Sequence, residues 1–204
     1  MIRLSVIEGV WTVRLSRPNK ANALTEKMLE EICSIAGEAQ KARAMILTGD
    51  GDVFSAGADL QAVKQGLATS NVWERASGAI EKLPCLTIAA LNGTLAGGAF
   101  GIALACDLRI AVPTANFFYP VMKLGYLPQP SDPARMSALI GPARTKMILL
   151  AGQKLDANAA LLFGLIDRIC PYEALLDTAH SFTDGVRAAL PSHGTSIKNM
   201  CESI

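Results

Sequence analysis

Two glycine-rich turns are the features of this sequence best suited to chemistry. The first covers residues 55–59 (SAGAD), after a short apolar run, and the second covers residues 95–99 (LAGGA), where a strand-like run feeds a helix-like run. Small side chains leave backbone N–H groups accessible, and a helix start adds unpaired donors and a partial positive charge. Such a turn suits a phosphate or a developing oxyanion. The alternative is that the glycines only permit tight turns and close packing.

Other kinds of catalytic site lack the residues they need. His180 and His193 are the two histidines, and neither has a Ser or Cys partner in a nucleophile motif or a second histidine at metal-binding spacing. Glycines 97, 98 and 101 do not form G-x-G-x-x-G, and no acidic residue follows at the required distance. The sequence therefore disfavours a triad hydrolase, a zinc enzyme and a dinucleotide-binding fold.

Length and composition predict one globular domain with an apolar core. The chain has 204 residues, of which 50% are hydrophobic and 18% charged, and its net charge is +1. That charge gives no reason to expect a nucleic acid partner, because phosphate-backbone binding needs a basic surplus. The five cysteines are odd in number and contain no C-x-x-C pair, and the first residues do not resemble a signal peptide. Reduced thiols and a cytoplasmic location are the expectation.

One uncharged run has the length of a membrane span. It covers the 24 residues between Lys82 and Asp107. Asn92-Gly93-Thr94 is a polar turn signal at its middle, and no basic asymmetry flanks it. We therefore expect a buried strand, a turn and a helix, and no association with a membrane.

Hydrophobic periodicity alternates between the strand and helix types along the chain, which is typical of an α/β sheet. Thr25 and Asp156 are the expected N-caps of two helices, and Gly141-Pro142 is expected to separate two others. The predicted strands cover residues 2–6, 10–15, 44–47, 86–91, 108–112 and 167–170. The predicted helices cover residues 25–40, 61–83, 98–106, 133–141, 142–151, 157–163 and 172–190.

Four segments in series resemble the crotonase (enoyl-CoA hydratase/isomerase) superfamily over nearly the whole chain. They are Arg17-Pro18 with Asn22-Ala23-Leu24, FSAGADL (54–60), NGTLAGGAFGIALACD (92–107) and GPARTKMILLAGQKLDANAALLFGLIDRI (141–169). The resemblance implies a spiral of ββα turns with a short helical C-terminal region. It divides the chain into a core with its helical extension over residues 1–190 and a short tail over residues 191–204, where relatives continue further.

The resemblance also implies a ligand and a site. The substrate is a coenzyme A thioester of the kind found in fatty acid metabolism, without a further cofactor or a metal, and the assembly is a homotrimer or a dimer of trimers. The backbone N–H groups of Ala58 and Gly98 correspond to the oxyanion hole. Residues expected to bind the substrate around them are Lys20, Ala56, Gly57, Asp59, Leu60 and Gly97. For Asp59, a helix cap is the stronger alternative.

The sequence departs from the family at the residues that move protons. The positions of the two usual glutamates are taken by Gly101 and Val121, and neither transfers a proton. The following loop offers Tyr119 and Asp132 as candidate catalytic residues, with Gln129 between them. The alternatives are aromatic packing for Tyr119 and a helix cap for Asp132.

The expected function follows from these departures. Hydration needs a general acid and a general base, so an isomerase or decarboxylase that stabilises a thioester enolate is favoured. A non-catalytic CoA-thioester binder or a partner subunit of an active homologue is the main alternative. A hydratase with a relocated acid and base is a minor one.

Overall fold

The computed structural model describes residues 1–202, so the end of the tail predicted over residues 191–204 lies outside the described part. Two sheets form the centre of the molecule. The six-stranded sheet has the order β1 (Ile2–Ile7), β2 (Val10–Leu15), β3 (Ala44–Gly49), β5 (Leu86–Leu91), β7 (Leu108–Ala111) and β10 (Arg168–Ile169). The four-stranded sheet has the order β4 (Val53–Ser55), β6 (Thr94–Ala96), β8 (Asn116–Phe118) and β9 (Leu155–Asp156).

The chain alternates between the two sheets and so builds a spiral. β3, β5 and β7 lie in the first sheet, and the strands that follow them, β4, β6 and β8, lie in the second. All pairings among these strands are parallel, whereas β1 with β2 and β8 with β9 are antiparallel. This ββα repetition is the crotonase-like fold that the resemblance predicts.

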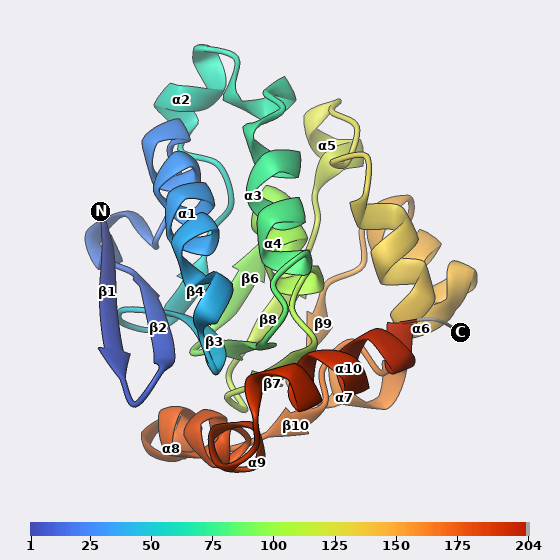
Figure 1. Cartoon of the computed structure of the whole chain (residues 1–204). Helices are drawn as coiled ribbons and strands as arrows, with labels where there is room; N and C mark the ends of the chain where they lie inside the picture. The colour runs from blue at the N-terminus through green and yellow to red at the C-terminus, as the bar shows by residue number, and fades with distance from the viewer. Residues whose placement is uncertain (203–204) are drawn as a thin grey trace.

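Helices surround the two sheets. Figure 1 shows α1 (Glu26–Glu38), α3 (Val72–Glu81) and α4 (Phe100–Leu104) side by side in front of the strands. α6 (Asp132–Leu149) and α7 (Ala157–Phe163) lie on the side away from β1, and α8 (Leu175–Ser181), α9 (Asp184–Ala188) and α10 (Pro191–Glu202) lie across the lower end. The short helices α2 (Leu60–Lys64) and α5 (Val121–Leu124) stand at the upper end.

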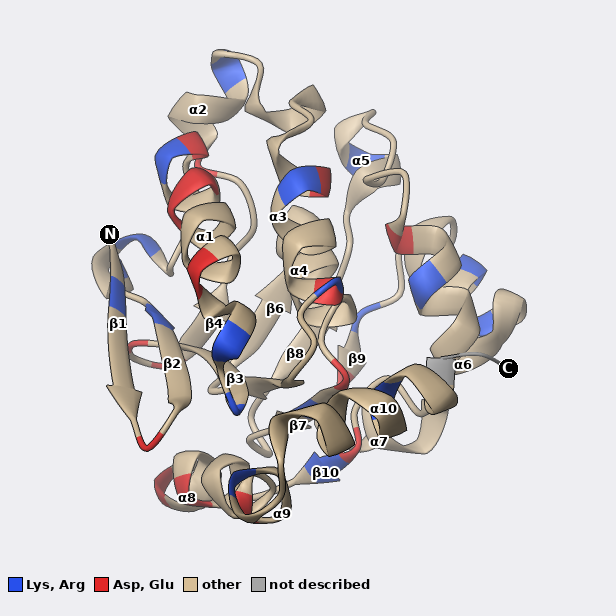
Figure 2. Cartoon of the chain, viewed as in Figure 1, with Lys and Arg blue, Asp and Glu red and all other residues tan. Residues whose placement is uncertain are grey.

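Burial follows from this layering. Every residue of β3 is buried, because both faces of this parallel strand are covered by other elements. The largest fully buried side chains include Phe54, Phe100 and Phe117, which come from three successive turns of the spiral. Charged residues lie mainly on the outer helices and the connecting loops, whereas β6 and β8 have none (Figure 2).

Most elements predicted from periodicity are confirmed, and two expectations are wrong. The long helix predicted over residues 172–190 is divided into a 3₁₀ turn (Tyr172–Ala174), α8 and α9. α8 and α9 are separate because the chain turns at Phe182-Thr183, where the Thr183 hydroxyl donates to the His180 carbonyl at 2.7 Å. The stretch over residues 61–83 is likewise divided, into α2, a 3₁₀ turn (Leu67–Thr69) and α3. Gly141, at φ 78°, separates two helical segments as predicted.

The uncharged run between Lys82 and Asp107 forms β5, β6 and α4, as the turn signal at its middle predicts. In the part of the chain that the structure describes, none of the helices has the length and apolar character needed to cross a bilayer.

Two buried asparagines hold the loops that carry the chain from the first sheet to the second. Asn22 donates to the carbonyls of Asp50 and Val53 at 2.9 and 2.7 Å. Asn92 accepts from the Gly49 N–H at 2.8 Å and donates to the Gly51 carbonyl at 2.6 Å. The amide side chains thus satisfy backbone groups that the short loop leaves without strand partners.

We predict that Asn92→Ala lowers the free energy of unfolding by about 1–3 kcal/mol, because the buried Gly49 N–H loses its partner and the partly buried bond to the Gly51 carbonyl is also lost. Urea unfolding measures the change. Asn158→Ala, at an exposed position of α7, is the matched control and should change stability by less than about 0.5 kcal/mol. Equal effects of both substitutions would contradict the role given to Asn92.

Candidate active site

A cavity of about 190 Å³ opens between the two glycine turns, α3 and the loop that contains α5. Six of the residues predicted from the sequence to be catalytic or to bind substrate line it together: Ala56, Ala58, Leu60, Gly97, Gly98 and Tyr119. Its other walls are largely apolar, and Gln129 and Tyr126 add polar groups. Among the described residues, no Lys, Arg, His, Asp or Glu lines it. The cavity is therefore a nearly apolar site with a few polar atoms.

Strand pairing brings the two glycine turns together. β4 and β6 pair in parallel, so the turns that follow them meet at the same edge of the sheet. A Cβ on Gly57 would lie 2.9 Å from the Ala96 carbonyl oxygen, and Gly57 has φ +90°. Only glycine allows this approach and this backbone conformation without strain. The spacing between the two turns thus depends on Gly57.

Each turn presents a backbone N–H that the fold does not use. The amide groups on both sides of Ala58 are occupied: Gly57 N–H donates to the Ser55 hydroxyl at 3.2 Å and Asp59 N–H to the Leu24 carbonyl at 2.8 Å. The Ala58 N–H itself donates to none of the described residues. Gly98 is the second residue of the 3₁₀ turn Gly97–Ala99, where an N–H has no intrahelical acceptor. Two donors therefore border the same cavity.

Tyr119 and Asp132 form a buried hydrogen-bonded pair in the cavity wall. The Tyr119 hydroxyl donates to Asp132 Oδ2 at 2.9 Å and accepts from the Gln129 N–H at 3.3 Å. The Tyr119 ring stacks on Phe100 with centroids 5.4 Å apart. Tyr119 lines the cavity and Asp132 lies behind it with 0% exposure. The cap expected of the Asp132 side chain is wrong, because its carboxylate turns inward to Tyr119 and leaves the start of α6 uncapped.

The Asp132 carboxylate uses space that the missing side chain of Gly101 leaves free. A Cβ on Gly101 would lie 2.8 Å from Asp132 Oδ1. That oxygen is buried and has no hydrogen-bond partner among the described residues. A carboxyl group thus reaches α4 from α6, at a position where α4 itself has no side chain.

Burial governs the protonation of the pair. Desolvation raises the pKa of Asp132 to about 7, and the hydrogen bond from Tyr119 and the charge of Arg135 oppose it only in part. Burial, together with the negative charge of Asp132, raises the pKa of the Tyr119 hydroxyl well above its usual range. Near neutral pH, Asp132 is therefore the group of the pair that gains and loses a proton, while Tyr119 stays protonated.

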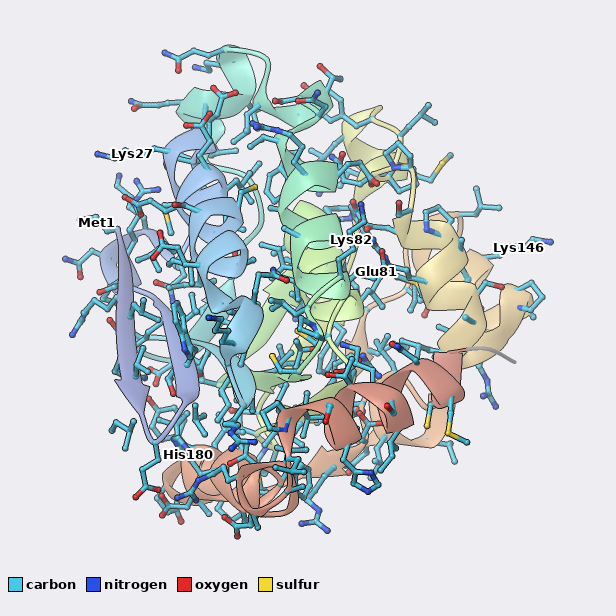
Figure 3. All side chains as sticks on the ribbon, viewed as in Figure 1. Met1, Lys27, Glu81, Lys82, Lys146 and His180 are labelled. Carbon is cyan, nitrogen blue, oxygen red and sulfur yellow. The ribbon has the colours of Figure 1, made fainter. Side chains whose placement is uncertain are left out.

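α3 fixes the start of α6 and thereby the position of Asp132. Arg135 of α6 donates to both carboxylate oxygens of Glu81 at 2.8 and 2.7 Å. Glu81 and Lys82 lie at the end of α3 that faces α6, whereas Lys146 extends away from the far end of α6 (Figure 3). Glu74 accepts from the N–H and the hydroxyl of Ser131. These charge-assisted bonds hold the residue before Asp132 and the residue three after it.

Three residues predicted to bind the substrate lie outside the cavity wall. Lys20 is exposed in the 3₁₀ turn Pro18–Lys20. Asp59 caps α2 by accepting from the N–H groups of Gln61 and Ala62, and it pairs with Arg17 at 3.1 Å. The cap expected of Asp59 is confirmed, whereas a role in substrate binding stays a prediction. Gly57 packs against Gly97 rather than lining the cavity.

Trp73 is the prominent cavity residue that the sequence reasoning missed. It comes from α3, where it lies on the buried face with Ala76 and Ile80, so periodicity marks it as a core residue and does not distinguish it as a cavity residue. The signal available was rarity, because the chain has two tryptophans and 5% aromatic residues. Trp73 lines the cavity beside Gly98.

Comparison with known proteins gives consistent matches in sequence and fold. The family model described as enoyl-CoA hydratase/isomerase matches residues 6–203. "Probable enoyl-CoA hydratase echA6" of Mycobacterium leprae is 34% identical over 175 residues, covering 83% of this chain and 71% of that protein. Short-chain-enoyl-CoA hydratase of Clostridium acetobutylicum is 32% identical over 195 residues, covering 89% and 73%. The crystal structure of enoyl-CoA hydratase from Bacillus anthracis has a TM-score of 0.93 at 28% identity and covers 99% of this chain and 82% of that one.

We predict that Asp132 makes the stability of the protein depend on pH. Its pKa is raised in the folded state, so between about pH 4 and pH 7 the folded protein holds a proton that the unfolded chain releases. The free energy of unfolding should therefore fall as pH rises through this window, by about 1 kcal/mol per pH unit. Asp132→Asn should remove this slope in urea unfolding measured from pH 4 to 8. Identical slopes for the two proteins would refute a buried, titrating Asp132.

We also predict that Gly101→Ala destabilises the protein by about 1–3 kcal/mol, because the new methyl group meets Asp132 Oδ1. In an Asp132→Ala background the same change should cost at least about 1 kcal/mol less, which a double-mutant cycle of unfolding free energies measures. Gly78→Ala is the matched control, since Gly78 lies in α3 with nothing within 4 Å of its Cβ position. Additive effects in the cycle would show that the two positions do not compete for space.

Proposed function

Because the chain belongs to the enoyl-CoA hydratase/isomerase family, we propose that it binds a coenzyme A thioester in this cavity and stabilises the thioester enolate. The N–H groups of Ala58 and Gly98 are the proposed donors to the carbonyl oxygen, which becomes negatively charged in the enolate. Three observations support this assignment: the Ala58 N–H has no acceptor among the described residues, Gly98 is the second residue of its 3₁₀ turn, and the cavity walls around both are apolar. Removing one such donor costs about 3 kcal/mol in related chemistry. The proposed reaction needs no resident cofactor.

Ordinary hydration of a double bond is poorly supported by the cavity. Addition of water needs a base and an acid within hydrogen-bond reach of the substrate. Gly101 and Val121 stand where the family resemblance implies glutamates, and no carboxylate lines the cavity among residues 1–202. A reaction that needs one proton donor beside the enolate fits the residues better.

The buried Tyr119–Asp132 hydrogen bond is the observation that carries the proposal. Tyr119 is the part of the pair that lines the cavity, and its raised pKa keeps the hydroxyl protonated, so that a proton is present to be passed on. Asp132 titrates near neutral pH, so it can supply the proton that Tyr119 gives up. The pair is thus suited to protonating an enolate carbon and, when Asp132 is ionised, to relaying a proton away from one.

Decarboxylation of a malonyl-type thioester uses these groups most directly. The bond from Cα to the carboxylate breaks, CO₂ leaves, and the electron pair moves into the enolate held by Ala58 and Gly98. With Asp132 protonated, Tyr119 gives its proton to Cα and takes the proton of Asp132 in its place. The Asp132 carboxylate left behind then takes up a proton that comes from solvent. The cavity wall offers no cation to a substrate carboxylate, so loss of that charge as CO₂ is favoured.

Isomerisation of an enoyl thioester is the second candidate, and the pKa of Asp132 favours it. Ionised Asp132 can accept the Cα proton through Tyr119, and the pair can return it to the γ carbon while the double bond moves. The main alternative in another class is a family member that binds CoA thioesters without turnover. The homotrimer implied by the family resemblance stays a prediction.

The proposal is tested by turnover of malonyl-CoA and a 3-enoyl-CoA, followed as loss of substrate by chromatography. Tyr119→Phe should lower kcat by roughly 10²- to 10⁴-fold, because the hydroxyl that protonates the enolate is gone. Gly98→Pro, which removes one proposed donor, should lower kcat by at least about 10²-fold. Tyr172→Phe, an exposed tyrosine outside the cavity, is the matched control and should retain activity.

The outcomes separate the alternatives. Binding of acyl-CoA without turnover of either substrate would favour the non-catalytic binder. Brisk hydration of crotonyl-CoA would instead show a relocated acid and base. Full activity of Gly98→Pro would overturn the assignment of the oxyanion donors.

A further inference from the structure

The cavity has a rigid inner end and an exposed mouth. Trp73 is 2% exposed, whereas Leu60 and Leu127 at the mouth are 80% and 87% exposed. A ligand therefore enters past the leucines and meets the indole ring of Trp73 at the inner end. The exposed side chains of Leu60 and Leu127 are free to move aside for a ligand, whereas the buried ring of Trp73 is not.

Two contacts hold the Trp73 ring in place. Its Nε1–H donates to the Leu67 carbonyl at 2.8 Å, so the polar edge of the ring is fixed to the 3₁₀ turn before α3. Three of its ring carbons lie 3.3 Å from the position of a Cβ on Gly98. The indole thus stands against the turn that carries one of the two proposed enolate donors. The first carbons of an acyl group whose carbonyl reaches Gly98 must lie beside this ring.

The volume of the cavity limits what fits there. About 190 Å³ is below the roughly 300–1,000 Å³ typical of pockets for drug-sized ligands. An acyl chain that grows beyond a few carbons from the carbonyl must displace the wall. Tyr119, the other aromatic side chain buried in the wall, is stacked on Phe100 and hydrogen-bonded to Asp132. Its ring is therefore also held in place and does not move aside for a longer acyl chain.

We infer that Trp73 sets the upper limit of acyl-chain length, so that the ligands of this site are thioesters of short acyl groups. This inference rests on the proposed function, because it assumes that a thioester carbonyl lies at Ala58 and Gly98. Trp73 acts as a specificity-determining residue, since it excludes carbons from the inner end and takes no part in proton transfer.

Calorimetric titration with coenzyme A and with acetyl-, butyryl-, hexanoyl- and octanoyl-CoA tests the inference without requiring turnover. The wild-type protein should bind butyryl-CoA more tightly than octanoyl-CoA. In Trp73→Ala the ratio of the two dissociation constants should shift by at least about 10-fold toward octanoyl-CoA, the smallest discrimination expected for added carbons in a pocket. Trp73→Leu removes less volume and should shift the same ratio in the same direction.

Controls keep the result interpretable if the alanine variant is unstable. Trp73→Leu and Trp73→Phe retain much of the buried side chain, and circular dichroism verifies their fold before titration. Trp11→Leu removes the other tryptophan, which lies on β2 outside the cavity, and should leave the ratio unchanged. An unchanged ratio in folded Trp73 variants, or equal affinity of the wild-type protein for butyryl- and octanoyl-CoA, would overturn the inference while leaving thioester binding intact. No preference of the wild-type protein for any acyl-CoA over coenzyme A would instead count against the proposed function.

Discussion

The parallel pairing of β4 with β6 is the constraint on which the site depends. It places the turns after both strands at one edge of the second sheet, and Gly57 lets them approach until a Cβ would meet the Ala96 carbonyl. Because the turns are this close, Ala58 and Gly98 border the same cavity. The asparagines Asn22 and Asn92 support this arrangement, since both bond to backbone groups of the loop that leads from β3 into β4.

A second constraint is that the side chain in front of α4 is supplied by α6. Gly101 contributes no side chain to the space in front of α4, and the Asp132 carboxylate from α6 lies there instead. This origin of the carboxylate affects the chemistry of the cavity as well as its packing. A carboxylate reaching in from α6 lies behind Tyr119, so it acts on the cavity through a hydroxyl group rather than directly. Burial at this position then raises its pKa to about 7, which places its titration at neutral pH.

α3 links these features. One turn of this helix brings Trp73 into the cavity wall and Glu74 to the N–H and hydroxyl of Ser131. Glu81, at the end of the same helix, binds Arg135. The helix that bounds the inner end of the cavity thus also fixes the start of α6, where Asp132 lies. A displacement of α3 would change the shape of the cavity and the Tyr119–Asp132 pair together.

The amino-acid sequence by itself was sufficient for much of this description. Hydrophobic periodicity predicts the strands of the first sheet, because four of them have six residues each, and small-residue turns predict where N–H groups are accessible. It also marks Gly101 and Val121 as positions without proton chemistry. Strands β4, β6 and β8, of three residues each, are too short for periodicity to reveal, so the second sheet was not predicted.

Only the tertiary structure decided how the candidate residues are related. The same Ser131-Asp132-Pro133 sequence permits a helix cap or a buried acid, and the space in front of Gly101 favours the buried acid. Trp73 lies 25 positions before Gly98 in the chain, and the packing of α3 on α4 brings the two together. Local sequence determines which groups a residue offers, whereas burial, pKa and contact depend on elements that are distant along the chain.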